Sequence, residues 1–171
     1  MTRTKARELA IRLIYAQAAS DSETLLEDFL EPEHFESLAS EDELFSEKPE
    51  GASLEYIRRL LGLFGKKPDK ESLGYIRTLV SLCAANREEI DSYIEKYAIG
   101  WRPERITRTA AAVLRCALTE LLYVEDVPPS AVINEAVELA KRYEEPETVA
   151  FINGVLGGFA RGEGLAPETA E

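Results

Sequence analysis

The sequence predicts an all-α protein built from small helical bundles. Apolar residues recur at spacings of three and four over most of the chain, which is the period of an amphipathic helix. Prolines mark the expected helix starts, and the only short apolar run with a strand-like look, residues 121–124, is more simply the end of a helix. At 171 residues and 45% apolar content, the chain suits one domain or two small packed halves.

The first predicted helix spans residues 2–19 and is apolar on more than one side. A broad face is joined by a second stripe, formed by Ile11 and Tyr15 four residues apart. A helix that is apolar around most of its circumference is usually enclosed, so we expect it to lie centrally between two bundles. Its N-terminal end carries three cations: Arg3, Lys5 and Arg7. On composition alone they are either a solvated face or phosphate contacts.

An acidic insert follows at about residues 21–65. Between residues 21 and 50 there are twelve acidic residues and one lysine, a net charge of −11 in a chain of net charge −12. Short helices are expected near 22–30 and 53–64, with a long loop or a partly ordered hairpin between them. Because salt screens charges beyond about 8–10 Å, a basic patch elsewhere can still act locally.

A long helical stretch is predicted over residues 69–99. Asp69 is its expected N-cap, and residues 86–88 are the point where it would bend. An elbow at residues 100–103 follows, in which Trp101 is expected to pack against the protein rather than stack on a base.

Three more helices are predicted over residues 103–124, 129–143 and 146–159. Each has an apolar stripe, and connections this short force the three faces to pack together. Glu138 precedes Arg142 by four residues, the favoured order for a helical ion pair. Residues 161–171 carry no pattern and are expected to form a flexible tail.

Catalytic and metal-binding patterns are lacking in the sequence. His34 is the only histidine, and no acidic pair falls in a predicted cleft, so we expect neither an enzyme nor a metal site or cofactor. Cys83 and Cys116 are expected to be reduced core thiols, with a disulfide or a reactive thiol as the alternative. No apolar run approaches the ~20 residues of a membrane span, and the first helix is too charged for a secretory signal. A cytoplasmic location is therefore expected.

Four sequence segments are distinctive when read together: residues 113–121, 126–129, 133–141 and 151–156. Their order and spacing, across about 45 residues, resemble the NusB family of bacterial transcription antitermination factors. Residues 3–10 are similar to a thinned version of the family's arginine-rich first helix. The resemblance covers residues 1–20 and 70–160 and fails between them.

The resemblance implies a NusB-like fold, with two small helical bundles packed around a central N-terminal helix in a single domain over residues 1–160. It implies a non-catalytic, RNA-binding role in transcription regulation. With NusE, a small-subunit ribosomal protein, the family holds single-stranded leader RNA of the boxA type, notably of ribosomal RNA operons. This makes RNA polymerase resistant to termination. Whether the chain also forms a homodimer is left open.

Site residues follow from the resemblance by matching position. Arg3, Lys5 and Arg7 would contact RNA phosphates, Phe151 would stack on a base, and Asn153 would make a polar contact. Tyr15 occupies a position that the family uses toward NusE. A core anchor is the alternative for Phe151, and a small residue admitting a close helix is the alternative for Asn153.

Several positions depart from the family pattern. Ala110 replaces a common acidic residue, Ala150 a common lysine and Ser130 a common basic residue, so the partner contact and some phosphate contacts are weakened. The alternative function is a protein-interaction module that keeps the fold with weak or lost RNA binding. The acidic insert either covers part of the core or competes with RNA for the basic patch.

Overall fold

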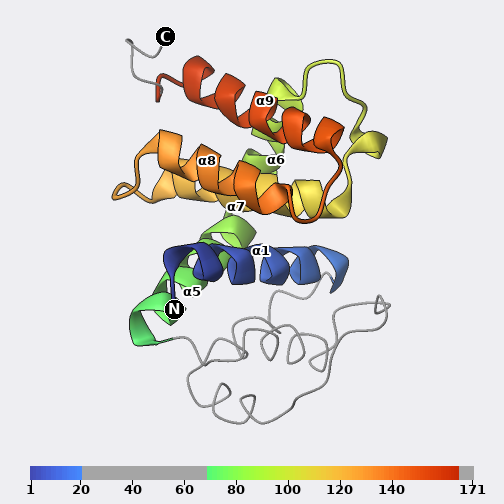
Figure 1. The fold of residues 1–171 in the computed structure, drawn as a ribbon. Coiled ribbons are helices and arrows are strands. Elements are labelled where there is room, and N and C mark those ends of the chain that lie inside the picture. The colour runs from blue at the N-terminus through green and yellow to red at the C-terminus, as the bar shows by residue number, and fades with distance from the viewer. Residues whose placement is uncertain (21–68, 166–171) are drawn as a thin grey trace. The chain divides into compact units, whose positions relative to one another are not determined.

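The computed structural model describes residues 1–20 and 69–165 (Figure 1). Every regular element in these residues is helical, which confirms the predicted all-α class. The chain divides into two compact units, residues 1–84 and 85–171, and each is considered by itself. The acidic insert, with the short helices predicted at 22–30 and 53–64, lies outside the described residues.

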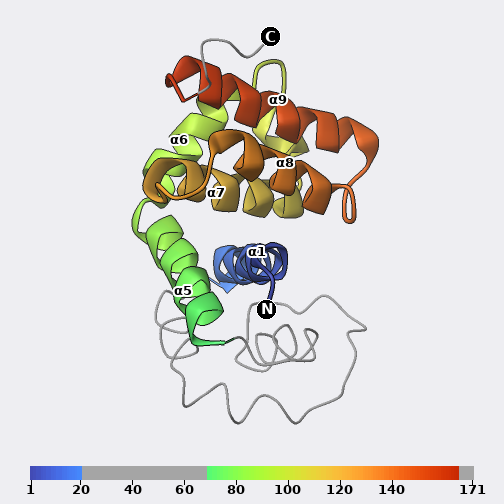
Figure 2. The same ribbon diagram turned by 60° about the vertical axis from the view of Figure 1, so that its left-hand side comes forward.

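In the first unit, the described helices are α1 (Arg3–Ser20) and α5 (Lys70–Ala85), which lie beside each other in Figures 1 and 2. The start of α1 is capped by Thr2, whose Oγ1 accepts a hydrogen bond from the Lys5 N–H at 3.2 Å. The broad apolar surface predicted for this helix is buried: Ala6, Leu9, Ala10, Ile11, Leu13 and Ile14. Burial on so many sides confirms that α1 is enclosed.

The N-cap predicted for α5 is confirmed. Asp69 Oδ1 accepts a hydrogen bond from the Ser72 N–H at 2.7 Å. The other carboxylate oxygen of Asp69 lies 3.0 Å from the N-terminal amine of Met1, and the Ser72 hydroxyl donates to the Met1 carbonyl at 3.4 Å. The start of the chain is thereby tied to the start of α5.

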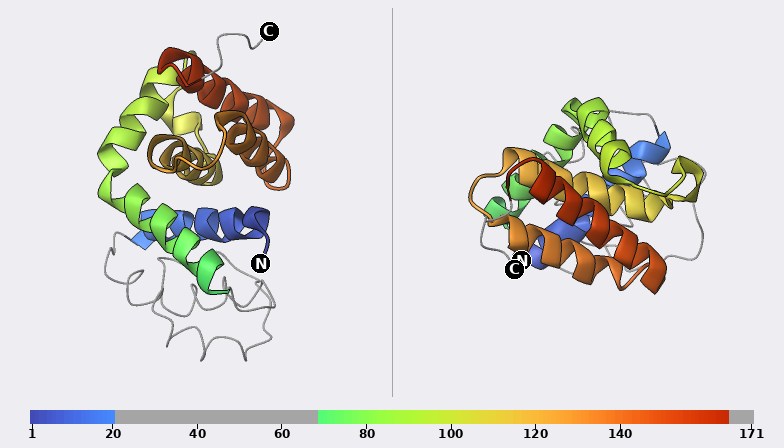
Figure 3. Two further views of the ribbon diagram at one scale, coloured as in Figure 1. Left: turned by 90° about the vertical axis from the view of Figure 1, so that its left-hand side faces the viewer. Right: turned by 90° about the horizontal axis from the view of Figure 1, so that it is seen from above.

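The second unit contains four α-helices and a short 3-10 helix among its described residues (Figure 3). In chain order they are α6 (Arg87–Tyr97), η1 (Pro103–Arg105), α7 (Arg108–Tyr123), α8 (Pro129–Ala140) and α9 (Pro146–Gly162). Helix α7 packs against α6, α8 and α9, and α9 also packs against α6 and α8. Because α7 is surrounded by these helices, it is buried around most of its circumference. The buried Thr119 hydroxyl finds its hydrogen-bond partner within the helix, donating to the Arg115 carbonyl at 2.6 Å.

Several helix boundaries differ from the predicted ones. The long stretch is broken at Asn86 into α5 and α6, as the bend signal indicated. The predicted helix 103–124 was wrong at its start: Pro103 opens only a 3-10 turn. Thr107, in an extended conformation, caps α7 by accepting a hydrogen bond from the Ala110 N–H at 3.1 Å. Helix α8 ends at Ala140 rather than at residue 143.

Polar contacts tie the second unit together at its ends. Arg115 of α7 forms a bidentate ion pair with Asp91 of α6. Its Nε donates to Oδ1 at 2.8 Å and its Nη2 donates to Oδ2 at 3.2 Å. Helix α9 runs to Gly162, and Glu163 beyond it accepts hydrogen bonds from Lys96 at 3.1 Å and Tyr97 at 2.9 Å. Residues 161 and 162 of the predicted tail thus belong to α9, and Glu163 contacts α6.

Two smaller expectations have different outcomes. Cys83 and Cys116 are both buried and neither is in a disulfide, which agrees with the predicted core thiols. Glu138 forms an ion pair with Lys141 at 2.8 Å, three residues away, and its predicted pair with Arg142 stays a prediction. None of the helices among residues 1–20 and 69–165 is long and apolar enough to cross a membrane.

Candidate nucleic-acid interface

The three predicted cations at the start of α1 differ in exposure. Arg3 and Lys5 are exposed, whereas the Arg7 side chain is only 7% exposed. Arg3 and Arg7 are four residues apart, so both lie on the same side of α1, and that side faces Tyr75 of α5. The guanidinium carbon of Arg3 is 4.0 Å from the centre of the Tyr75 ring, and that of Arg7 is 6.0 Å from it.

The N-terminal amine is a fourth positive charge in this region, and it is already paired. Its partner Asp69 has a pKa lowered to about 2, first by the hydrogen bond from the Ser72 N–H and then by the bond from the amine. The carboxylate thus stays ionised at neutral pH and neutralises the amine. Arg3 and Lys5 are left as the exposed cations at this end of α1.

Phe151 lies in the second turn of α9, where its ring is 6% exposed. The ring centre is 4.3 Å from that of Trp101, at an interplanar angle of 32°. This contact supports the packing alternative for Phe151 and agrees with the packing role expected for Trp101. Asn153, two residues further on, points to another side of α9 and is exposed.

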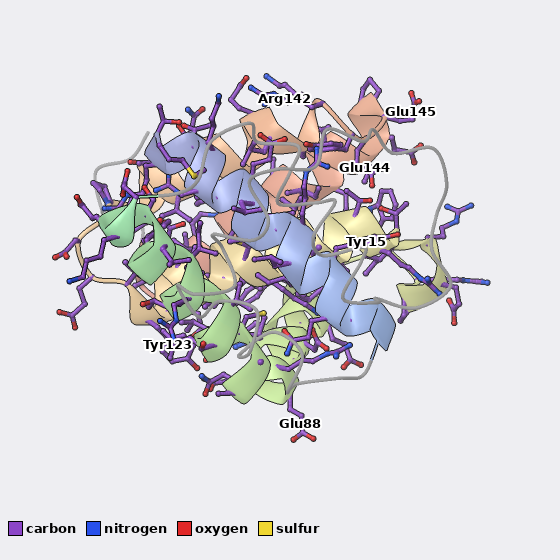
Figure 4. The ribbon with its side chains drawn as sticks, turned by 90° about the horizontal axis from the view of Figure 1, so that it is seen from below. Tyr15, Glu88, Tyr123, Arg142, Glu144 and Glu145 are labelled. Atoms are coloured by element: carbon purple, nitrogen blue, oxygen red, sulfur yellow. The ribbon has the colours of Figure 1, made fainter. Side chains whose placement is uncertain are left out.

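The predicted partner-facing residue Tyr15 is half-buried on α1, where Figure 4 shows it. Ala110, which stands where the family often has an acidic residue, is 0% exposed. A carboxylate at this buried position would carry a desolvation cost, so an alanine fits the local structure. Figure 4 also shows Arg142, Glu144 and Glu145 at the connection between α8 and α9, where Glu144 accepts a hydrogen bond from Thr107.

The predicted site residues therefore fall into two groups. Arg3, Lys5, Arg7 and Tyr15 belong to the first unit, and Phe151 and Asn153 belong to the second. Within the first group the structure brings Arg3 and Arg7 to one aromatic ring. The meeting of the two groups on one RNA stays a prediction.

Sequence reasoning missed Tyr75. It falls next to Ile76, which is fully buried, and so it is easily taken as part of the apolar side of α5. A tyrosine on a helix that packs against an arginine-bearing helix is a natural cation–π partner, but the sequence alone does not show that these two helices meet. Three further exposed arginines lie between α6 and α7 or at the first residue of α7: Arg102, Arg105 and Arg108.

No group of three or more potential metal ligands occurs within the described part of the chain. Among the described residues, the candidate interface offers the cations of Arg3 and Lys5, the exposed amide of Asn153 and aromatic rings such as that of Tyr75. These are the groups with which proteins bind single-stranded nucleic acid.

Comparison with known proteins gives a consistent family assignment. The profile of the NusB family matches residues 41–161. The "Transcription antitermination protein NusB" of Symbiobacterium thermophilum is 35% identical over 164 residues, covering 95% of this chain and 91% of that protein.

Solved structures agree with this assignment. The NusB structure from T. maritima is 25% identical with a TM-score of 0.64, covering 94% of this chain and 92% of that one. A chain in a structure called "Crystal Structure of a Plectonemic RNA Supercoil" is 23% identical with a TM-score of 0.66, covering 97% and 100%, and it supports the fold alone. The family profile, the full-length relative and the shared all-helical fold together show that this chain belongs to the NusB family.

Proposed function

We propose that this protein is a non-catalytic transcription antitermination factor that binds single-stranded leader RNA together with NusE. The RNA is of the boxA type, notably in ribosomal RNA operons, and the bound complex acts on RNA polymerase. The observation that carries the proposal is the exposure of Arg3 and Lys5 at the end of α1 in a chain of net charge −12. The family membership and the relative's name support the same role.

The number of contacts requires a partner. Two or three phosphate contacts give a salt slope of about −1.4 to −2.1 on a single strand, and one stacked base adds roughly 1–3 kcal/mol. Binding of this strength is weak and sensitive to salt. A second protein that holds the same RNA raises the effective concentration of the strand at α1, so NusE supplies affinity that the chain lacks alone.

The proposed roles of single residues follow from their exposure. Arg3 and Lys5 face solvent and meet the RNA directly, and Asn153 offers an exposed amide to a base or a sugar. Arg7 and Phe151 are buried, so in this proposal they act close behind the surface, Arg7 through its charge and Phe151 by packing α9 on Trp101. Tyr15 is the proposed contact to NusE.

The test is a titration of labelled boxA-like RNA with the protein, alone and with NusE, at low and at physiological salt. We expect weak binding alone, tighter binding with NusE, and a loss of affinity as salt rises. Changing Arg3, Lys5 and Arg7 together to Ala should remove most RNA binding and leave NusE binding intact. Unchanged RNA affinity in this variant would refute the assigned surface.

A second candidate function is a protein-interaction module with lost RNA affinity. The burial of Arg7 and Phe151, together with Ala150 and Ser130 in place of common basic residues, favours it. The same titration separates the two candidates. An absence of RNA binding at low salt, with NusE bound, would favour the interaction module.

A further inference from the structure

The burial of Phe151 under Trp101 raises the question of which group stacks on an RNA base. Single-strand binders combine cations that follow the backbone with planar groups on which bases stack. In the first unit, Tyr75 is half-buried and carries the exposed guanidinium of Arg3 on its ring. We propose that Arg3 and Tyr75 together form a stacking site for an unpaired RNA base. This inference rests on the proposed function and deepens it.

Burial and polar contacts position Tyr75 and the start of α1. Tyr75 lies on α5, where the neighbouring Ile76 is 0% exposed and holds the helix in the core. The start of α1 is tied to the start of α5 by the amine of Met1 on Asp69 and by the Ser72 hydroxyl on the Met1 carbonyl. These contacts lie within a few residues of Arg3. The guanidinium carbon lies 4.0 Å from the ring centre, so the stacked geometry is already present before RNA binds.

The chemistry of this pair suits a base better than a phosphate alone. A guanidinium is planar and weakly hydrated, and it stacks on aromatic faces, including those of bases. With one side of Arg3 on Tyr75, a base on the other side would complete a stack of ring, cation and base. Arg7, whose guanidinium carbon is 6.0 Å from the same ring, adds positive charge near this stack, and the exposed Lys5 is placed to meet an adjoining phosphate.

The competing explanation is that the contact of Arg3 with Tyr75 only stabilises the packing of α1 on α5. A stabilising contact affects every nucleic-acid ligand equally. A stacking site affects only ligands that carry a base. The two explanations therefore differ in how affinity depends on the presence of bases at a constant number of phosphates.

The experiment compares a short single-stranded RNA with an abasic ribose-phosphate backbone of equal length, each titrated with the NusE complex at several salt concentrations. The variants are Tyr75→Phe, which keeps the ring, Tyr75→Leu, which removes it, and Arg3→Lys, which keeps the charge and removes the plane. Arg105→Ala is the matched control, because it removes an exposed arginine from the other unit. Thermal unfolding checks that each variant is folded, and Arg3→Lys, at an exposed position, carries the test if Tyr75→Leu is unstable.

We expect Tyr75→Leu and Arg3→Lys to lose about 5- to 150-fold of affinity for RNA, the range of one stacked base. Affinity for the abasic backbone and the salt slope should stay at the wild-type values, and Tyr75→Phe should bind like the wild type. If the variants lose as much affinity for the abasic backbone as for RNA, or lose no affinity for RNA, the stacking site is refuted. RNA binding by the wild-type complex would then still support the proposed function. If the wild-type complex binds neither ligand, both the proposed function and the stacking site are refuted.

Discussion

The different burial of Lys5 and Arg7 predicts different effects on the salt dependence of RNA binding. Lys5 is exposed and Arg7 is 7% exposed, although they are two residues apart on the same helix. Each phosphate contact on a single strand contributes about −0.7 to the slope of log affinity against log salt. With Arg3 and Lys5 as the two contacts the slope is about −1.4, whereas three contacts would give about −2.1.

These slopes correspond to measurable changes in affinity. A fourfold rise in salt lowers affinity about 7-fold for two contacts and about 18-fold for three. Replacing Lys5 with Ala should bring the slope to about −0.7 with little effect on stability. Replacing Arg7 with Ala should leave the slope unchanged. It should also lower the free energy of unfolding by about 1–2 kcal/mol, since it removes a buried side chain and its contact with the Tyr75 ring.

The assay is fluorescence anisotropy of labelled RNA over a series of salt concentrations, with thermal unfolding of each variant measured in parallel. Equal reductions of the slope in the two variants would show that Arg7 reaches a phosphate directly. The reasoning from burial would then be wrong for this surface.

Four further predictions concern the fold. Gly162→Ala should destabilise the protein by about 1–3 kcal/mol in thermal unfolding. An added Cβ would lie 2.2 Å from the Tyr97 hydroxyl oxygen. Gly154→Ala, with open space at its Cβ, should be neutral or stabilising. In NMR, the Asp69 carboxyl should titrate near its pKa of about 2, below the value of about 3.9 in the unfolded chain. Its contribution to stability is therefore complete above about pH 4 and is lost as the pH falls toward 2. Phe159→Leu should cost about 1–3 kcal/mol by chemical denaturation, since its buried ring meets two tyrosines of α6 edge-on at 5.0 and 5.9 Å.

The helical class and most helix positions could be predicted because they depend on local patterns. Asp69 was predicted to be an N-cap because it directly precedes a helical pattern of apolar residues. The structure contains the expected hydrogen bond from the Ser72 N–H to its carboxylate. The start of α7 was missed because Pro103 and Thr107 are both acceptable helix starts, and the hydrogen bond to Thr107 decided between them.

The exposure of the site residues could not be predicted in the same way. A period of three and four identifies one side of a helix, but it does not say which neighbour covers a given polar residue. Arg7 is buried beside Tyr75, which is distant in sequence, and Phe151 is buried by Trp101 from another element. Such contacts depend on tertiary packing, which a single sequence does not reveal.

The most direct test of the central claim is an NMR footprint of single-stranded boxA-like RNA on the isotopically labelled protein bound to NusE. The account predicts that the largest amide and side-chain shifts on adding RNA fall on residues 3–7 of α1 and around Asn153 of α9. Shifts confined to other surfaces, such as the arginines between α6 and α7, or no shifts at low salt, would contradict it.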